Sequence, residues 1–172
     1  AAQIDFLLRK GNEGVLQGHP FVRRLLIWDK KHRKYLNLFR LTLQVRKEGY
    51  DLVLNLNRYF SSGLLTGLSG SKSRVCFDKN PLAFLATEEV PHVIGGADKF
   101  LHEVSRSLQL IGRWTPTMFV NPKIYPSNSD FERVRFDGKY ITISPASVWF
   151  TKQFPKEKWL EFMDRVGEET TI

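Results

Sequence analysis

Three side chains in one short stretch near the end of the chain could together hold an anion. In the segment SPASVWFTKQFP, Ser147 and Thr151 offer hydroxyl groups and Lys152 offers an ammonium group. Pro155 suits the first position of a helix, whose amino end carries free N–H groups and partial positive charge. This order predicts a loop that binds a diphosphate, with Lys152 as its main phosphate contact. A solvated lysine before a helix is the plainer alternative, and the pattern alone favours it.

A second set of polar side chains follows two apolar runs nearer the start of the chain. Arg9 and Lys10 come after the run IDFLL, and Asn57 and Arg58 come after DLVLNL. In open α/β sheets ligands bind at the carboxyl ends of the strands. These four residues therefore predict a cationic rim for an acidic acceptor. A helix cap and ordinary surface charges explain Asn57 and Arg58 equally well.

A third set lies on an expected helix that His102 and Glu103 open, with Arg106 one turn later. The default interpretation is a helix face with partners three and four residues apart. The four histidines show no metal-ligand spacing with Cys, Asp or Glu, so no metal site is predicted. The dinucleotide, P-loop and nucleophile-elbow motifs are missing from the sequence, and no cofactor is expected.

Alternating strands and helices must position these side chains. Short apolar runs predict strands at residues 4–9, 21–28, 50–57, 74–77 and 140–143. Helical spacing predicts helices at residues 15–19, 36–48, 63–68, 98–111 and 155–166, and residues 78–97 look irregular. Gly49 suits the end of the second helix, and Ser61 or Ser62 could cap the third. The order predicts an α/β fold with a mainly parallel sheet.

Composition indicates where the chain divides into domains and which classes of partner it favours. Residues 112–138 are rich in Pro, Asn and Ser and predict a connector between a domain at 1–111 and the start of a second domain at 139–172. Residues 1–50 hold 11 Lys/Arg against 4 Asp/Glu, a net charge of +7 out of +8 for the chain. Such basicity favours nucleic acid, anionic lipid or a phosphorylated glycan. The single Cys76 predicts a buried strand thiol and a reducing, cytoplasmic setting.

The chain resembles the family-9 glycosyltransferases, the heptosyltransferase group that acts on lipopolysaccharide. The likeness lies in YDLVLNLNRYFSSGLLTGLSGSKSRVCFD, in KFLHEVSRSLQLIG and in SPASVWFTKQFPKEKW, in that order. The resemblance implies two Rossmann-like domains in the GT-B arrangement, of which this chain would hold the acceptor-side domain and the first strand, loop and helix of the nucleotide-sugar domain. It also implies inverting transfer from a nucleoside-diphosphate sugar such as ADP-heptose to an anionic glycolipid, with peripheral contact at the inner face of the cytoplasmic membrane.

The same resemblance suggests roles for individual residues. Lys152 matches the motif lysine near the donor phosphates, and Ser147 matches a hydroxyl residue of that loop. The acceptor-side segments that would face the cleft contain Asn57, Arg58, His102 and Arg106. Members of the family open with a strand and a glycine-containing loop whose Asp is the proposed base, and residue 1 already resembles their second strand. The catalytic residue is therefore unknown, and we expect this chain alone to be inactive.

Two other functions stay open at this point. A non-catalytic relative could bind an anionic glycan or nucleotide without turnover, and a basic domain could bind nucleic acid. Most aromatic residues here sit at core spacing and are not interleaved with Arg and Lys as a stacking platform requires. We therefore expect no nucleic-acid partner.

Overall fold

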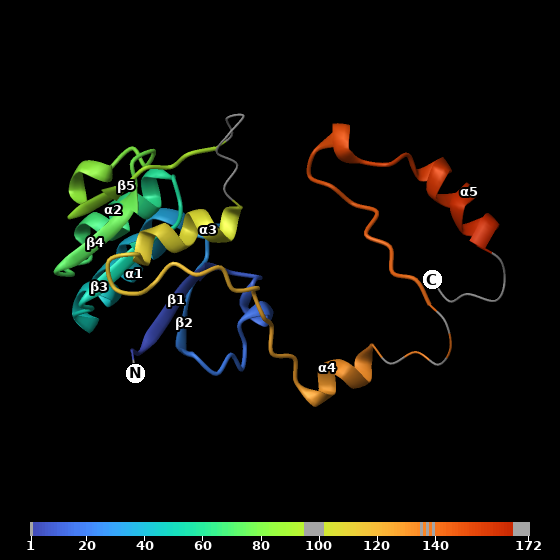
Figure 1. Ribbon diagram of the computed structural model, residues 1–172, viewed down its shortest axis with the longest axis horizontal. Coiled ribbons are helices and arrows are strands. Elements are labelled where there is room, and N and C mark those ends of the chain that lie inside the picture. The colour runs from blue at the N-terminus through green and yellow to red at the C-terminus, as the bar shows by residue number, and fades with distance from the viewer. Residues whose placement is uncertain (1, 95–101, 135, 137, 139, 167–172) are drawn as a thin grey trace. The chain divides into compact units, whose positions relative to one another are not determined.

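The chain forms two compact units, which we describe one at a time. A computed structural model describes residues 2–94, 102–134, 136, 138 and 140–166 (Figure 1). Unit 1 comprises Ala1–Tyr125 and unit 2 comprises Pro126–Ile172. The boundary between the units falls inside the segment that the sequence predicts to be a connector.

Unit 1 is built on parallel strands, as the sequence predicts. Strands β1 (Ile4–Arg9) and β2 (Val22–Trp28) pair in parallel, and β3 (Leu52–Asn55), β4 (Ser73–Phe77) and β5 (Glu88–Val90) form a second parallel sheet in that order. The connections between neighbouring strands pass through helices, which gives the α/β class. The α/β prediction with a parallel sheet is confirmed.

Helices follow the strands in the predicted order. The α-helices of unit 1 are α1 (Lys34–Glu48), α2 (Phe60–Leu68) and α3 (Glu103–Leu108), and the 3-10 helices are η1 (Glu13–Val15), η2 (Ala83–Leu85) and η3 (Gln109–Ile111). Helix α1 ends as predicted at Gly49, whose left-handed backbone (φ 66°) suits a residue without a side chain. The Gly49 N–H donates to the carbonyl of Arg46.

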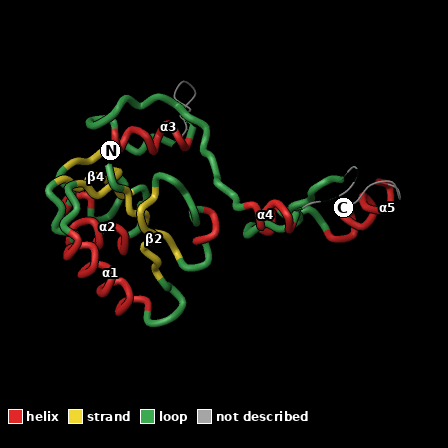
Figure 2. The backbone as a smooth tube through the Cα atoms, turned by 90° about the horizontal axis from the view of Figure 1, so that it is seen from below, coloured by secondary structure: helices red, strands yellow, loops and turns green. Residues whose placement is uncertain are grey.

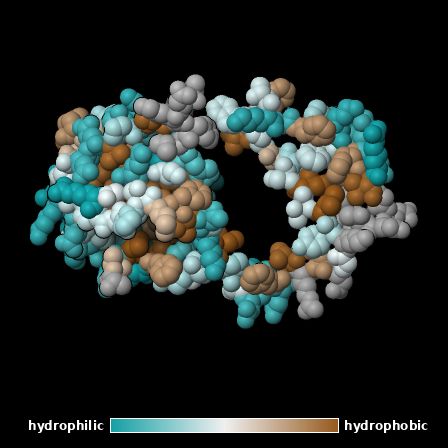
Figure 3. Space-filling model, viewed as in Figure 1, coloured by the Kyte–Doolittle hydropathy of each residue, from teal (hydrophilic) through white to brown (hydrophobic). Residues whose placement is uncertain are grey.

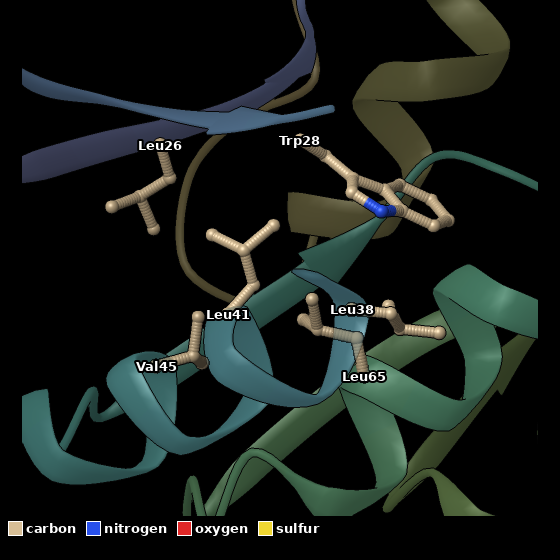
Figure 4. Packing of buried hydrophobic residues seen from close by; sticks show 6 residues of the cluster. All are labelled: Leu26, Trp28, Leu38, Leu41, Val45 and Leu65. Atoms are coloured by element: carbon tan, nitrogen blue, oxygen red, sulfur yellow. The ribbon is translucent and has the colours of Figure 1, made fainter. Parts of the chain in front are cut away.

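Two layers of apolar side chains enclose the strands. Helices α1 and α2 lie on one side of the strands and α3 on the other (Figure 2). On the first side, β2, α1 and α2 supply one buried cluster (Figure 4): Leu26, Trp28, Leu38, Leu41, Val45 and Leu65. On the opposite face, Leu110 of η3 packs against Val75 and Phe77 of β4. Each such side chain contributes about 1.5–3 kcal/mol when it leaves water, so these layers hold the strand ends in place.

A buried carboxylate ties the amino ends of β1 and β3 together. The Asp5 side chain is 1% exposed and accepts hydrogen bonds from Arg23 (2.7 and 2.8 Å), from Arg24 (2.8 Å) and from the hydroxyl of Tyr50 (2.5 Å). Arg24 also contacts Glu48 at the end of α1 at 3.0 Å. The hydrogen bond from Arg23, with those from Tyr50 and Arg24, lowers the pKa of Asp5 far below its usual value despite burial.

Three local expectations for unit 1 are wrong. The helix expected at 15–19 is instead the 3-10 turn η1, and the segment 78–97, expected to be irregular, contains η2 and β5. Strand β5 has only three residues, two of them Glu, so it carries no apolar alternation that a sequence pattern could detect. Helix α2 begins at Phe60 after an N-cap at Tyr59, and the Ser62 hydroxyl donates to the Tyr59 carbonyl instead of capping the helix. Residues 98–101 of the predicted helix 98–111 lie outside the described residues.

Unit 2 has helices but no sheet among its described residues. It contains α4 (Asn128–Arg133), the 3-10 turn η4 (Phe150–Lys152) and α5 (Lys156–Val166). Among the described residues the strand predicted at 140–143 does not form, because Tyr140 makes a single β-bridge and residues 141–147 belong to no strand. Helix α5 buries none of its side chains, and brown apolar residues show at the surface of this unit (Figure 3).

Candidate functional site at the carboxyl edge of the strands

Polar side chains gather where the parallel strands of unit 1 end. Parallel strands in one sheet point the same way, so the segments that follow them meet at one edge, which is where open α/β sheets bind ligands. Arg9 closes β1 and Asn55 closes β3, while Asp78 follows β4 and His92 comes two residues after β5. We call the set Asn55, Arg58, His92 and Arg106 the carboxyl-edge site.

Of the predicted rim residues Arg9 and Lys10, Lys10 lies beside a carboxylate. Lys10 forms an ion pair with Asp29 at 3.0 Å, and Asp29 also accepts from the backbone N–H groups of Lys31 (2.9 Å) and His32 (3.1 Å). The hydrogen bond from Lys10, followed by those from His32, lowers the pKa of Asp29 well below its usual value. Lys10 is thus partly neutralised by its partner, whereas Arg9 is exposed.

Lys30, in the loop that follows β2, also belongs to the rim. Its ammonium lies 4.2 Å from the centre of the Trp28 ring and 5.9 Å from that of Tyr59. Burial lowers the pKa of Lys30, and the positive charges of Arg9 and Lys34 lower it further. Because Trp28 ends β2 and Tyr59 follows β3, Lys30 lies between the carboxyl edges of the two sheets. Its neighbours Arg9 and Lys34 add to the positive field there.

Hydrogen bonds to buried side chains hold the loop after β3 in place. The backbone N–H of Asn57 donates to the Asn55 side chain at 2.9 Å, and the Asn57 carbonyl accepts from the Asn80 amide at 2.9 Å. Asn80 is 3% exposed and also donates to the Tyr59 carbonyl at 3.2 Å. These bonds fix the backbone of the loop, and the side chains of Asn57 and Arg58 stay exposed.

Helix α3 brings its predicted residues to the same region. His102 is the N-cap of α3: its Nδ1 accepts from the Val104 N–H at 3.2 Å, and its ring lies edge-on to Phe119 at 5.3 Å. Arg106 forms an ion pair with Glu103 one turn earlier, which confirms the expected i,i+3 pair. Arg106 is 8% exposed, and its guanidinium donates to the Val93 carbonyl at 3.4 Å, so the side chain points into the protein.

Three buried nitrogen atoms at this edge have no hydrogen-bond partner within the described part of the chain. They are Nδ2 of Asn55, Nδ1 of His92 and Nε of Arg106, in residues that are 5%, 9% and 8% exposed. A buried polar atom without a partner costs about 1–3 kcal/mol, so it marks a place where a ligand or a water molecule completes the bonding. Asn55 and Arg106 can donate to such a ligand, and the His92 nitrogen can donate or accept.

The carboxyl-edge site combines the positive charges of Arg58 and Arg106 with an uncharged His92 ring. Burial lowers the pKa of His92, and the charges of Arg58 and Arg106 lower it further. The His92 ring is therefore neutral at pH 7, and it packs edge-on against Phe77 at 4.5 Å. Two guanidinium groups beside a neutral imidazole suit a ligand with carboxylate or phosphate oxygens.

The sequence prediction missed Asn55 and His92. A clear signal existed for Asn55, because an amide that closes a buried parallel strand lies at the ligand-binding edge. No signal existed for His92, since it follows a strand that the sequence does not reveal. Among the residues that the structure describes, no group of three or more His, Cys, Asp or Glu could hold a metal ion.

The predicted phosphate loop in unit 2 is open to solvent. The Ser147 hydroxyl accepts from the Trp149 N–H at 3.2 Å, and the Ser147 carbonyl accepts from the Gln153 amide at 2.7 Å. Thr151 and Lys152 lie in η4 with exposed side chains, directly before α5. The structure thus places the three predicted residues in one short loop ahead of a helix, and their role as phosphate ligands stays a prediction.

Comparison with known proteins agrees with this architecture. A solved structure of a family-9 glycosyl transferase from Veillonella parvula superposes on 98% of this chain with a TM-score of 0.78 at 15% sequence identity. A lipopolysaccharide heptosyltransferase 1 from Campylobacter coli is 29% identical over 80 residues, which are 46% of this chain. This chain spans 53% of the length of the solved structure and 23% of the Campylobacter protein.

The family model of glycosyltransferase family 9 covers most of the sequence. It matches residues 38–171, which run from the second turn of α1 in unit 1 through nearly all of unit 2. The matched range contains the whole carboxyl-edge site and the loop with Ser147, Thr151 and Lys152. On this match the chain belongs to glycosyltransferase family 9, the heptosyltransferase family.

Proposed function

We propose that unit 1 is the acceptor-binding side of an inverting glycosyltransferase that moves a sugar from a nucleoside-diphosphate sugar to an anionic glycolipid of the lipopolysaccharide type. The observation that carries the proposal is the set of buried, unpartnered nitrogen atoms of Asn55, His92 and Arg106 at the carboxyl edge. An acceptor with carboxylate or phosphate oxygens would supply the missing hydrogen-bond partners. The printed name of the Campylobacter relative, a lipopolysaccharide heptosyltransferase, agrees with such an acceptor.

We assign the donor to unit 2. Lys152 and the hydroxyls of Ser147 and Thr151 would contact the diphosphate, and the amino end of α5 would add its N–H groups. In an inverting transfer the acceptor hydroxyl attacks the anomeric carbon while the diphosphate leaves, so cations near the phosphates stabilise the charge that develops. A base must take the hydroxyl proton, and we assign that role to no described residue.

Arg9, Lys10, Asn57 and Arg58 would form the outer part of the acceptor site. They follow β1 and β3 at the same edge, and Lys30 adds a further cation there. His102 would act through α3, because its ring caps the helix that carries Arg106. We place the reaction in the cytoplasm, in keeping with the free thiol of Cys76.

Binding of a phosphorylated lipopolysaccharide core oligosaccharide, measured by calorimetry, tests the acceptor assignment. We expect Arg58→Gln and Arg106→Gln each to weaken binding by about tenfold, because each removes one charge-assisted contact. Arg58 is exposed, so its replacement leaves folding intact. Arg113→Gln, an exposed arginine paired loosely with Glu88 at 3.5 Å, is the matched control. Binding that is unchanged in both Arg58→Gln and Arg106→Gln would refute the acceptor assignment.

Binding of ADP tests the donor assignment separately. We expect ADP to raise the melting temperature of the protein, and Lys152→Ala to remove that rise. Lys156→Ala, a nearby exposed lysine in the first turn of α5, is the control and should keep the effect. Equal stabilisation of the parent protein and of Lys152→Ala would show that Lys152 does not hold the phosphates.

A further inference from the structure

The imidazole of His92 is held in one orientation at the carboxyl edge. The backbone N–H of His92 donates to the Asp78 carboxylate at 2.9 Å, and its ring packs edge-on against the buried Phe77 at 4.5 Å. His92 is 9% exposed, and its Nδ1 has no hydrogen-bond partner within the described part of the chain. Nδ1 is therefore a buried hydrogen-bonding group in a fixed position that a ligand can use.

The surroundings of His92 keep its ring uncharged at pH 7. Burial has the largest effect and lowers the pKa of His92. The positive charges of Arg58 and Arg106 lower this pKa further, whereas the charge of Asp78 acts in the opposite direction. The carboxylate of Glu103, one turn earlier on α3, forms an ion pair with Arg106. The site thus presents a neutral imidazole together with two guanidinium groups.

A neutral imidazole and a guanidinium group recognise different kinds of oxygen atom. A guanidinium group only donates hydrogen bonds, so it suits the oxygens of a carboxylate or phosphate, which only accept them. A neutral imidazole has one nitrogen that donates and one that accepts. A hydroxyl group both donates and accepts, so it pairs with Nδ1 whichever of the two nitrogens carries the proton.

We propose that His92 is a specificity-determining residue of the carboxyl-edge site, where its Nδ1 recognises a hydroxyl group of the ligand. Arg58 and Arg106 would hold the anionic group of the same ligand, so the inference rests on that part of the proposed function. The chemistry that satisfies both kinds of side chain is a polyol that carries a phosphate or a carboxylate. A ligand without the hydroxyl group would leave Nδ1 buried and unpaired, which selects against that ligand.

Two small phosphates that differ only in their hydroxyl groups test this selectivity. Glycerol 3-phosphate carries hydroxyl groups beside its phosphate, and propyl phosphate has the same carbon chain without them. We expect the full chain to bind glycerol 3-phosphate about tenfold more tightly than propyl phosphate, which is the factor that one lost hydrogen bond to a buried group produces. Titrations followed by nuclear magnetic resonance measure both dissociation constants.

Two replacements of His92 separate hydrogen bonding from packing. His92→Asn removes the ring but places an amide near the position of Nδ1, whereas His92→Phe keeps a ring against Phe77 and cannot form the hydrogen bond. We expect His92→Asn to keep the preference for glycerol 3-phosphate to within about threefold. His92→Phe should abolish it by weakening the binding of glycerol 3-phosphate about tenfold, with propyl phosphate unchanged.

A replacement at another histidine is the matched control. His19→Phe lies between η1 and β2, where the His19 ring contacts Phe21 and Tyr125. It makes the same chemical change as His92→Phe away from the carboxyl ends of the strands. It should leave the affinity for both phosphates unchanged. The amide spectra recorded in the same titrations show whether each variant is folded.

Several results would overturn the role of His92. They are equal affinity of the parent chain for the two phosphates, binding of neither phosphate, and a preference that His92→Phe retains. Loss of the preference in both His92→Phe and His92→Asn would also overturn it, because the amide should replace the hydrogen bond.

The acceptor assignment can fail or stand separately from this inference. Binding of the oligosaccharide that depends on Arg58, without any preference between the two phosphates, would remove only the role of His92. A preference that His92→Phe removes would support the role of His92 even if the oligosaccharide did not bind.

Discussion

The residue that most constrains unit 1 is Asp5, whose carboxylate joins three elements. It accepts bonds from both arginines of β2 and from Tyr50, which precedes β3, while Arg24 extends the network to Glu48. Sequence reasoning did not find this network. Asp5 sits in a strand pattern between two apolar residues, and only the packing of β1 against β2 shows that its side chain is buried.

Asp5→Asn should destabilise the chain by about 2–4 kcal/mol, because the neutral amide leaves two partly buried guanidinium groups without their shared anion. Asp51→Asn, at an exposed acidic residue just before β3, should change stability by less than about 0.5 kcal/mol. Urea unfolding at pH 7 measures both variants. Equal stability of Asp5→Asn and the parent chain would show that the network is not stabilising.

The same carboxylate predicts how stability depends on pH. The side chain of Asp in an unfolded chain has a pKa of about 3.9. In the folded chain hydrogen bonds, chiefly those from Arg23, lower the pKa of Asp5. The stabilisation from Asp5 is therefore complete above that unfolded value and is lost as the pH falls below it. The parent chain should lose stability on acidification from pH 5 to pH 3 more steeply than Asp5→Asn does. Parallel profiles would contradict the assignment.

Cys76 should be unreactive while the chain is folded. The thiol is buried in β4, as the sequence predicts, and burial raises its pKa, with smaller contributions from Glu89 and Asp78. We expect modification by a disulfide reagent to be slower by about a hundredfold or more in the native chain than in urea, because both thiolate formation and access are suppressed. A native rate close to that of free cysteine would show that β4 opens readily.

At the scale of elements, Gly63 lets α2 approach the segment that leads into η2. A methyl group on Gly63 would lie 2.2 Å from the Asn80 side-chain oxygen and 2.9 Å from Leu82 Cβ. Asn80 in turn holds the carbonyls of Asn57 and Tyr59. The small residue in α2 therefore lets the loop after β3 take its position at the carboxyl-edge site.

Gly63→Ala should destabilise the chain by about 1–3 kcal/mol, although alanine usually stabilises a helix by about 1 kcal/mol relative to glycine. The cause is the contact with Asn80, which must move. Gly14→Ala is the matched control, because nothing lies within 4 Å of the added methyl group there. Thermal unfolding of the two variants measures the difference. A more stable Gly63→Ala would mean that Asn80 and Leu82 can shift without cost.

Elements were predicted where local pattern and tertiary packing agree. The sequence reveals β3 because the strand is a short apolar run. It reveals α1 because the buried residues of the helix recur at helical spacing. Strand β5 and the strand expected at 140–143 were not predicted correctly, since strand formation depends on the neighbour. Glu88 and Glu89 pair with β4 despite their charge, whereas Ile141 and Ile143 have no ladder despite their strong β-propensity.

At the scale of the whole molecule, the two units differ in how much they bury. Val75 is 0% and Phe77 1% exposed in unit 1, whereas neither α4 nor α5 buries a side chain. Amide hydrogen exchange should therefore be slow for β4 and faster by about a thousandfold or more for α5. Exchange requires the backbone hydrogen bonds to break, and in α5 they can break without exposing buried apolar side chains. Mass spectrometry of peptic fragments measures this. Equal protection in both units would contradict it.

The strand order also has a consequence for how the chain acquires its structure. Among the described residues of unit 1, each strand pairs with a strand adjacent in sequence, so residues 4–28 and 52–90 each form a sheet from one continuous stretch. The contacts of α1 with β2 and α2 join the two sheets, so loss of this helix would leave two separate two- and three-stranded pieces in place of one domain.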